Sequence, residues 1–196
     1  MKSKKKLKKH LGFGSLRHGL STLFRQLPDH RQIPKTNYSL HDAMMSGFAS
    51  MYFQDPSLLQ FQIRLREQEQ KDNLQTLFDV KNIPQNNQMR DIIDPVNSDM
   101  FRPVFKDYFS RLQRGNHLSQ FQLFPGLYLC TLDGTQYFYS DKIHCSNCLT
   151  TNHREGKVSY SHKVLQAAVM HPDMRQVIPL MPEEIRNTDF KRQTGL

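Results

Sequence analysis

The chain has 196 residues, a mean hydropathy of −0.66 and a formal net charge of +9. Its length suits one ordinary domain or two small ones, and no stretch approaches the ~18 consecutive apolar residues that a membrane helix needs. Arg17 and His18 interrupt the segment that would have to serve as a signal peptide, and three cysteines, an odd number, argue against a disulfide framework. We therefore expect a soluble cytoplasmic protein that has no membrane partner.

The positive charge is concentrated at the N-terminus. Residues 1–28 contain six lysines and two arginines but no acidic residue, and they carry +8 of the net charge of +9. A basic arm on a nearly neutral body is typical of nucleic-acid binding, because each phosphate contact releases counterions. A solvated or targeting tail fits equally well, because like charges repel one another and keep the chain open. We expect residues 1–14 to form a flexible arm whose DNA contacts, together with Arg25, are Lys4, Lys5, Lys6, Lys8 and Lys9.

Apolar residues at helical spacing predict a helical region over residues 15–116. Pro28 and Pro56 end the first two helical patterns, and Pro103 lies in the first turn of the last one. Helices are expected over residues 15–27, 40–55, 58–70 and 100–112, with Ser15, Ser39 and Ser57 as N-caps.

Residues 72–94 contain two short helical patterns, 72–78 and about 86–93, with a turn around Pro84 between them. Two such helices joined by a brief turn are compatible with a helix-turn-helix, whose second helix can enter the major groove of DNA. The exposed residues Asn87, Gln88 and Arg90 would then contact base edges or phosphates. The alternative is a helical corner in a bundle, and such corners greatly outnumber DNA-reading motifs.

After residue 116 the pattern changes to strands, which predicts an α+β fold class. The segments "GLYLCTL" and "TQYFYSDKI" predict two strands, and the Asp-Gly pair between them tolerates the positive φ of a tight hairpin turn. Two further strands are predicted in "VSYSHKVLQAAVM" and "QVIPLM", with a turn at "HPDMR". Asp133 therefore has two interpretations, as part of a hairpin turn or as a rigidly held carboxylate that could bind Mg²⁺.

The segment "HCSNC" places Cys145 and Cys148 at a spacing with which thiolates can bind Zn²⁺. His144 and His153 lie close by in the sequence, and His153 or His162 could supply a further ligand. A single C-x-x-C pair is nevertheless a weak signal. We expect two free thiols on an insertion loop and regard zinc as the less favoured alternative. Cys130, within a predicted strand, is expected in the core.

Four segments together resemble a known family. They are "LPDHR…SLHDAMMSGFASMYFQDPSLLQF", "NLQTLFDVKNIPQNNQMRDIIDPV", "YLCTLDGTQYFYSDKIHCSNC" and "YSHKVLQAAVMHPDMRQVIPLMPEEI". In order and spacing they are similar to the N-terminal half of bacterial insertion-sequence transposases of the DDE class, over about residues 24–186. The resemblance implies a helical DNA-binding region, a ribonuclease H-like catalytic domain, and Mg²⁺ or Mn²⁺ as cofactor. It also implies that Asp133, within "LDGT", is the first catalytic carboxylate.

The chain departs from this family after "PEEI". In the family a second catalytic Asp and a catalytic Glu follow, whereas this sequence reads "PEEIRNTDFKRQTGL" and ends. Residues 117–196 are therefore expected to form an incomplete ribonuclease H-like domain. Glu183, Glu184 and Asp189 are expected to be solvated loop residues and not replacements for the missing ligands.

The expected function is DNA transposition, in which a nucleoid-associated transposase binds double-stranded DNA at the ends of a mobile element and cuts and joins it. This chain is expected to be a truncated, inactive form that self-associates or associates with intact transposase, with no small-molecule substrate. One alternative is a non-catalytic DNA-binding protein that competes with intact transposase. Another is a zinc-stabilised interaction module that has no role in DNA binding.

Overall fold

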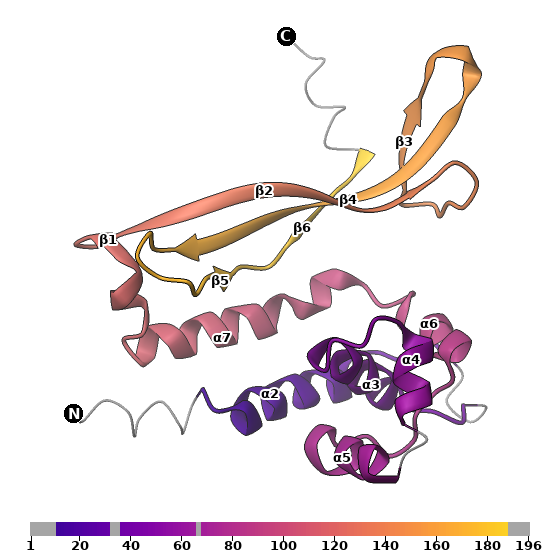
Figure 1. Ribbon diagram of the computed structural model, residues 1–196, viewed down its shortest axis with the longest axis horizontal. Helices are drawn as coiled ribbons and strands as arrows, with labels where there is room; N and C mark the ends of the chain where they lie inside the picture. The colour runs from indigo at the N-terminus through magenta and orange to yellow at the C-terminus, as the bar shows by residue number, and fades with distance from the viewer. Residues whose placement is uncertain (1–10, 32–35, 66–67, 188–196) are drawn as a thin grey trace. The chain divides into compact units, whose positions relative to one another are not determined.

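The computed structural model describes residues 11–31, 36–65 and 68–187, which form two compact units divided between Gly115 and Asn116. The described residues confirm the α+β class, with helices in the first unit and an antiparallel sheet in the second (Figure 1). None of the described helices has the length and hydropathy needed to cross a membrane. The helices are α2 (Phe13–Gln26), α3 (Leu40–Tyr52), α4 (Leu58–Arg64), α5 (Gln68–Phe78), α6 (Asn86–Ile93) and α7 (Arg102–Arg114), the last preceded by the 3₁₀ turn η2 (Ser98–Phe101).

Two of the three predicted N-caps are confirmed. The hydroxyl oxygen of Ser39 accepts a hydrogen bond from the backbone N–H of Asp42 at 2.9 Å, and Ser57 caps α4 in the same way. The prediction for Ser15 is wrong, because α2 begins two residues earlier, after Gly12. Ser15 instead lies in the first turn, where its hydroxyl accepts a hydrogen bond from Arg111 of α7 at 2.8 Å.

Helix α3 is the centre of the first unit, because α2, α5 and α6 all pack on it. Ala43, Met45 and Ala49 of α3 are fully buried, and so are Phe61 of α4 and Phe78 of α5. Full burial of a large apolar side chain stabilises a fold by about 1.5–3 kcal/mol. Small residues on α3 let the neighbouring helices approach, while the larger side chains fill the space between them.

A buried polar network crosses this core. The carboxylate of Asp42, which is 4% exposed, accepts hydrogen bonds from the backbone N–H groups of Lys81 at 3.1 Å and Asn82 at 3.2 Å. His41 lies between Asp42 and Ser21, with its Nε2 2.8 Å from the Ser21 hydroxyl. Burial alone would raise the pKa of Asp42, but the hydrogen bonds from His41 and the two amides outweigh it and lower the pKa. The network therefore ties α2, α3 and the segment after α5 together.

The second unit is organised around one long strand, β4 (Val158–Met170), which pairs antiparallel with β2 (Leu127–Ser140) along nearly its whole length. Strands β3, β6 and β5 also pair with β4, and β1 pairs with the start of β2. Figure 1 shows β2 and β4 as the two longest strands of the unit. The strands are β1 (Gln122–Phe124), β2 (Leu127–Ser140), β3 (Leu149–Asn152), β4 (Val158–Met170), β5 (Ile178–Pro179) and β6 (Glu183–Ile185).

The predicted hairpin turn at Asp133 is wrong. The two predicted strands are a single strand of 14 residues, and Asp133 and Gly134 lie in its middle, opposite Gln166 and Leu165 of β4. Among the described glycines, positive φ occurs at Gly126, in the turn between β1 and β2, and at Gly156, but not at Gly134. Pairing with β4 supplies ladder hydrogen bonds through the Asp-Gly pair, so tertiary context overrides the local turn signal.

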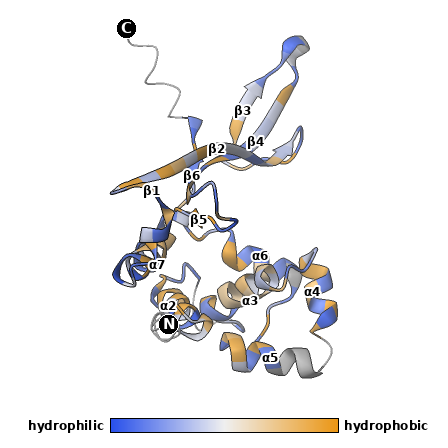
Figure 2. Ribbon diagram, turned by 60° about the vertical axis from the view of Figure 1, so that its left-hand side comes forward, coloured by the Kyte–Doolittle hydropathy of each residue, from blue (hydrophilic) through white to orange (hydrophobic). Residues whose placement is uncertain are grey.

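The sheet exposes large apolar side chains in the part of the chain that the structure describes. Phe124 and Leu127 are each 62% exposed, and Leu132 is 68% exposed. Figure 2 shows hydrophobic stretches along β1 and β2. Large exposed apolar patches are typical of protein interaction surfaces.

We expect Asp42→Ala to lower the free energy of unfolding of the first unit by about 1–3 kcal/mol, because it leaves two buried backbone N–H groups without an acceptor. Urea denaturation followed by helical circular dichroism at pH 7 would measure the loss. The matched control is Asp91→Ala, which removes an exposed carboxylate from α6. An equal effect of the two substitutions would contradict the role of the network.

The same network predicts a pH dependence. The pKa of Asp42 is lower in the folded chain than its ordinary value of 3.8. Its stabilising contribution is therefore complete above the unfolded-state pKa and is lost as the pH falls through the folded-state pKa. The stability difference between wild type and Asp42→Ala should accordingly shrink in acid, and urea denaturation at pH 7 and at pH 3 would measure the change.

Candidate metal centre

Asp133 lies at the middle of the ladder between β2 and β4, and the residues before and after it on β2 also pair with β4. Side chains alternate between the two faces of a strand, so Asp133 shares a face with Thr131 and Thr135 of β2 and with its partner Gln166. The side chain of Asp133 is exposed. A carboxylate on a paired strand is held more rigidly than one on a loop, which suits a ligand for a hard cation.

Two other polar side chains project from the same face of the sheet. His162 lies on β4 four residues before Gln166, and Glu184 of β6 lies opposite Val164. At ~3.3 Å per residue, His162 is about 13 Å from the level of Asp133 along the strand. Strand β4 separates Glu184 from Asp133 by two strand spacings, about 9.5 Å. Strand β4 and an offset of two residues along it therefore separate the two residues.

The acidic residues near the C-terminus differ from the prediction. Glu183 and Glu184 belong to strand β6 and not to a loop. Glu184 is half-buried and lies 3.7 Å from a guanidinium nitrogen of Arg186. Asp189 lies outside the described residues.

Three side chains converge where β2 ends and β4 begins. The Sγ atoms of Cys145 and Cys148 lie 3.7 Å apart, and each lies 3.3 Å from Nε2 of His162. Within the described ranges, these side chains form the only group of three or more His, Cys, Asp or Glu residues close enough to hold one metal ion. Asp133 belongs to no such group there.

The loop between β2 and β3 forms a tight turn that brings the two cysteines together. The backbone N–H of Cys148 donates to the carbonyl oxygen of Cys145 at 3.3 Å, and the N–H of Cys145 points at Sγ of Cys148 at the same distance. The hydroxyl of Ser140 accepts hydrogen bonds from Lys142 and Ile143 and so starts the loop. Asn187 donates to the carbonyl oxygen of Cys148 at 2.9 Å and holds its end.

A bulge in β2 fixes the ring of His162. The pairing of β2 with β4 shifts register between Gln136 and Phe138, so that Tyr137 is an extra residue on β2. Tyr137 stacks on the His162 ring with centroids 5.7 Å apart, and Phe138 contacts the same ring at 5.6 Å. Burial, followed by the charge of Glu184, raises the pKa of Tyr137.

The cysteines and histidines of the second unit differ in their burial and in the groups that they contact. Burial raises the pKa of the Cys148 thiol. Cys130 is exposed, so its predicted place in the core is wrong. His144 stacks on Tyr160 with centroids 4.3 Å apart, and His153 lies 2.6 Å from the hydroxyl of Ser159. Of the two histidines that the sequence allowed as further ligands, the structure brings His162 to the cysteine pair.

The predicted DNA contacts are placed only in part. Lys4, Lys5, Lys6, Lys8 and Lys9 lie outside the described residues. Arg25 of α2 forms an ion pair with Asp79, which offsets its charge. Asn87, Gln88 and Arg90 are exposed on α6, as predicted. Gln88 also accepts a hydrogen bond from the N–H of Gln85 at 3.3 Å and so helps to cap the helix.

The predicted helix-turn-helix at residues 72–94 differs from the observed arrangement. Helix α5 starts earlier than predicted, at Gln68, and residues 79–85 join it to α6. Both helices pack on α3. A helix-turn-helix has a connection of three or four residues and two helices that pack on one another. The arrangement therefore favours the helical-corner interpretation, while the exposed face of α6 remains available to a partner.

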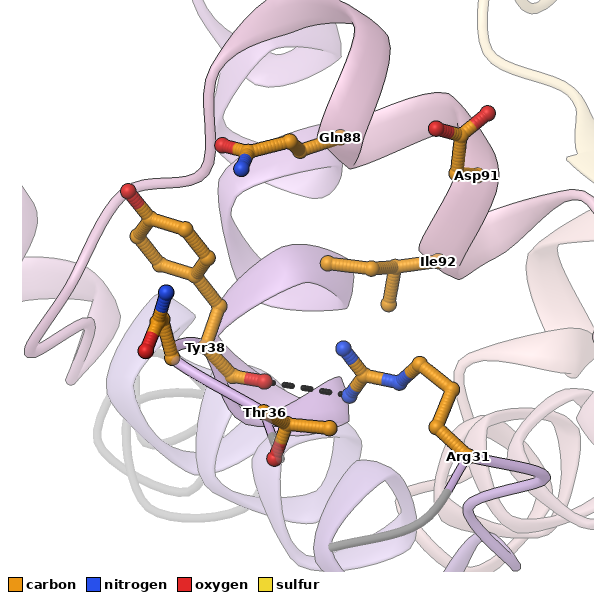
Figure 3. A pocket seen from close by; sticks show the side chains of 7 residues that line it. Arg31, Thr36, Tyr38, Gln88, Asp91 and Ile92 are labelled. Carbon is orange, nitrogen blue, oxygen red and sulfur yellow. Dashed lines mark hydrogen bonds between the residues drawn. The ribbon is translucent and has the colours of Figure 1, made fainter. Parts of the chain in front are cut away.

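A pocket of about 320 Å³ lies beside this face of α6 and is lined by Gln88, Asp91 and Ile92 (Figure 3). On its other side the Arg31 guanidinium donates to the backbone oxygen of Tyr38 at 3.0 Å. The same guanidinium makes a two-bond ion pair with Asp29, and its hydrogen bond lowers the pKa of that carboxyl. Arg31 thus links Asp29 to the backbone of Tyr38 at the wall of the pocket.

Comparison of the chain with protein-family models, with curated proteins and with solved structures gave no match.

Proposed function

We propose that this chain binds double-stranded DNA as part of a DDE-class transposase and that Asp133 is a carboxylate ligand for Mg²⁺ or Mn²⁺. The observation that carries the proposal is the place of Asp133, exposed in the middle of the longest ladder of the sheet. Four sequence segments similar to this family, in the family's order, support it. A ribonuclease H-like fold for the second unit, associated with the nucleoid, is part of the same proposal.

The charge distribution supports DNA as the partner. Residues 1–28 carry +8 of the net charge of +9, and this segment includes α2, whose residue Arg17 adds to the arm. A charge of this density releases counterions when it contacts phosphates, and this release drives sequence-independent binding. Exposed amide and guanidinium groups on α6, from Asn87 and Arg90, can add contacts to base edges.

The chemistry of DNA cleavage sets a limit on what the described residues can do alone. In-line phosphoryl transfer uses two metal ions ~4 Å apart, and holding both requires several carboxylates. Asp133 has no such neighbours within the described part of the chain. The same observation favours a second candidate function, a DNA-binding protein without catalysis that competes with a complete transposase for the same DNA.

Removing residues 1–10 should weaken binding to every duplex sequence, because this segment holds six lysines. The slope of log affinity against log salt should fall by up to ~0.9 for each lost phosphate contact. Fluorescence anisotropy with a labelled duplex at several salt concentrations measures both quantities. A variant with the six lysines changed to Ala at unchanged length is the matched control and should behave alike. Unchanged affinity and slope would contradict the proposal.

Arg90→Ala should change sequence preference more than the salt slope, if α6 contacts base edges. Loss of one good base contact costs ~1–3 kcal/mol of discrimination, or roughly a 5-fold to 150-fold change. The measurement compares affinity for a duplex carrying the ends of the encoding element with affinity for an unrelated duplex. Arg25→Ala is the control, and it should have the smaller effect because Asp79 already pairs with Arg25. Equal losses on both duplexes would assign Arg90 to phosphate contact alone.

The chain by itself should not cut DNA in the presence of Mg²⁺ or Mn²⁺. In a transposase that contains this sequence together with the further carboxylates, Asp133→Asn should abolish cleavage while DNA binding is retained. Asp141→Asn, which alters an exposed carboxylate just after β2, should leave cleavage intact. Cleavage that survives Asp133→Asn would remove this residue from the chemistry, and cleavage by the chain alone would show that a second copy completes the site.

A further inference from the structure

We infer that Cys145, Cys148 and His162 bind one Zn²⁺ ion. In a tetrahedral zinc site with Zn–S bonds of ~2.3 Å and Zn–N bonds of ~2.0–2.1 Å, two sulfurs lie about 3.8 Å apart, and sulfur and nitrogen about 3.6 Å. The observed separations are 3.7 Å between the sulfurs and 3.3 Å from each sulfur to Nε2 of His162. A disulfide would instead bring the sulfurs to ~2.05 Å. The three atoms occupy three corners of a zinc tetrahedron.

The chemistry of the ligands selects zinc over the hard cations. Two thiolates and one imidazole are soft to intermediate ligands, which favour Zn²⁺ over Mg²⁺, Mn²⁺ or Ca²⁺. Tyr137 and Phe138 contact the His162 ring from the bulge in β2 and hold its Nε2 toward the sulfurs. A ring held in this orientation before the metal arrives loses little rotamer freedom when it binds.

Solvent is the expected ligand at the fourth corner. Cys145 is exposed, so water can reach the ion at this side. The nearest alternative histidines are engaged elsewhere, since His144 stacks on Tyr160 and His153 lies within hydrogen-bond distance of Ser159. No fourth His, Cys, Asp or Glu joins the group within the described ranges. The site thus has three protein ligands and one exchangeable position.

The ion would fasten the loop 141–148 to strand β4. Cys145 and Cys148 lie on this loop, and His162 lies on β4, whose Ser161 pairs with Leu149 at the start of β3. A metal bond across this junction would add to the burial of Cys148, Leu149 and Ser161 in a small unit that has few other buried residues among those described. This zinc site departs from the sequence-based expectation of free thiols, and it holds whether or not the chain belongs to a transposase.

Metal analysis of the whole chain, purified without chelator, tests the inference. We expect about one zinc per chain, lost in Cys148→Ser and in His162→Ala. The matched controls Cys130→Ser and His153→Ala should keep the metal. Cobalt substitution should give the thiolate charge-transfer band in the near ultraviolet with wild type and with the controls. Zinc well below one per chain even after zinc supplementation, or full zinc content in both ligand variants, would overturn the inference.

A measurement on the wild-type chain avoids variants that fail to fold. With zinc bound, alkylation of Cys145 and Cys148 should be at least tenfold slower than after chelation, while the exposed Cys130 should react at the same rate in both states. Mass spectrometry of peptides resolves the three sites. Equal rates at Cys145 and Cys148 with and without chelator would overturn the inference. A disulfide between the two cysteines in freshly purified protein would overturn it as well.

Discussion

The antiparallel ladder between β2 and β4 is the interaction on which the second unit depends. It runs from Leu129 opposite Met170 to Ser140 opposite Tyr160, and the shorter strands β3, β5 and β6 attach to the free edge of β4. Register in a sheet decides which side chains share a face, because a slip of one residue moves every side chain to the other side. One ladder therefore places both Asp133 and His162 on a common face.

The bulge at Tyr137 divides the ladder into two parts whose side chains differ. Before the bulge, β2 presents polar side chains around Asp133, and at the bulge two aromatic rings, Tyr137 and Phe138, contact His162. An extra residue bends the strand and increases its local twist. Two consecutive residues of β2, Tyr137 and Phe138, consequently both contact His162. Asp133 and His162 lie on one face of the sheet but belong to separate sites.

Sequence reasoning succeeded where local rules decide the structure. Ser39 and Ser57 cap their helices because the first backbone N–H groups of a helix have no partner within it. A hydroxyl directly before the helix can accept a hydrogen bond from one of them. Sequence reasoning left Asp133 open between a turn and a rigidly held carboxylate, and the hairpin interpretation is wrong because the Asp-Gly signal is the same in a turn and in a paired strand. Local sequence could not choose between His153 and His162, because register alone brings the second to the cysteines. The buried Asp42 was missed, although a carboxylate on an apolar helical face was a signal for it.

The proposed Zn²⁺ site and the proposed Mg²⁺ or Mn²⁺ ligand can coexist on one face because their donor atoms differ. Thiolates at Cys145 and Cys148 favour zinc, whereas a lone carboxylate at Asp133 binds a hard cation weakly until other oxygens join it. A distance of about 13 Å along the strand exceeds the Debye length of ~8 Å at physiological salt, so the exposed charges of the two ions would barely repel one another. Zinc at one end of the ladder would thus stabilise the pairing of β2 with β4 without occupying the position of Asp133.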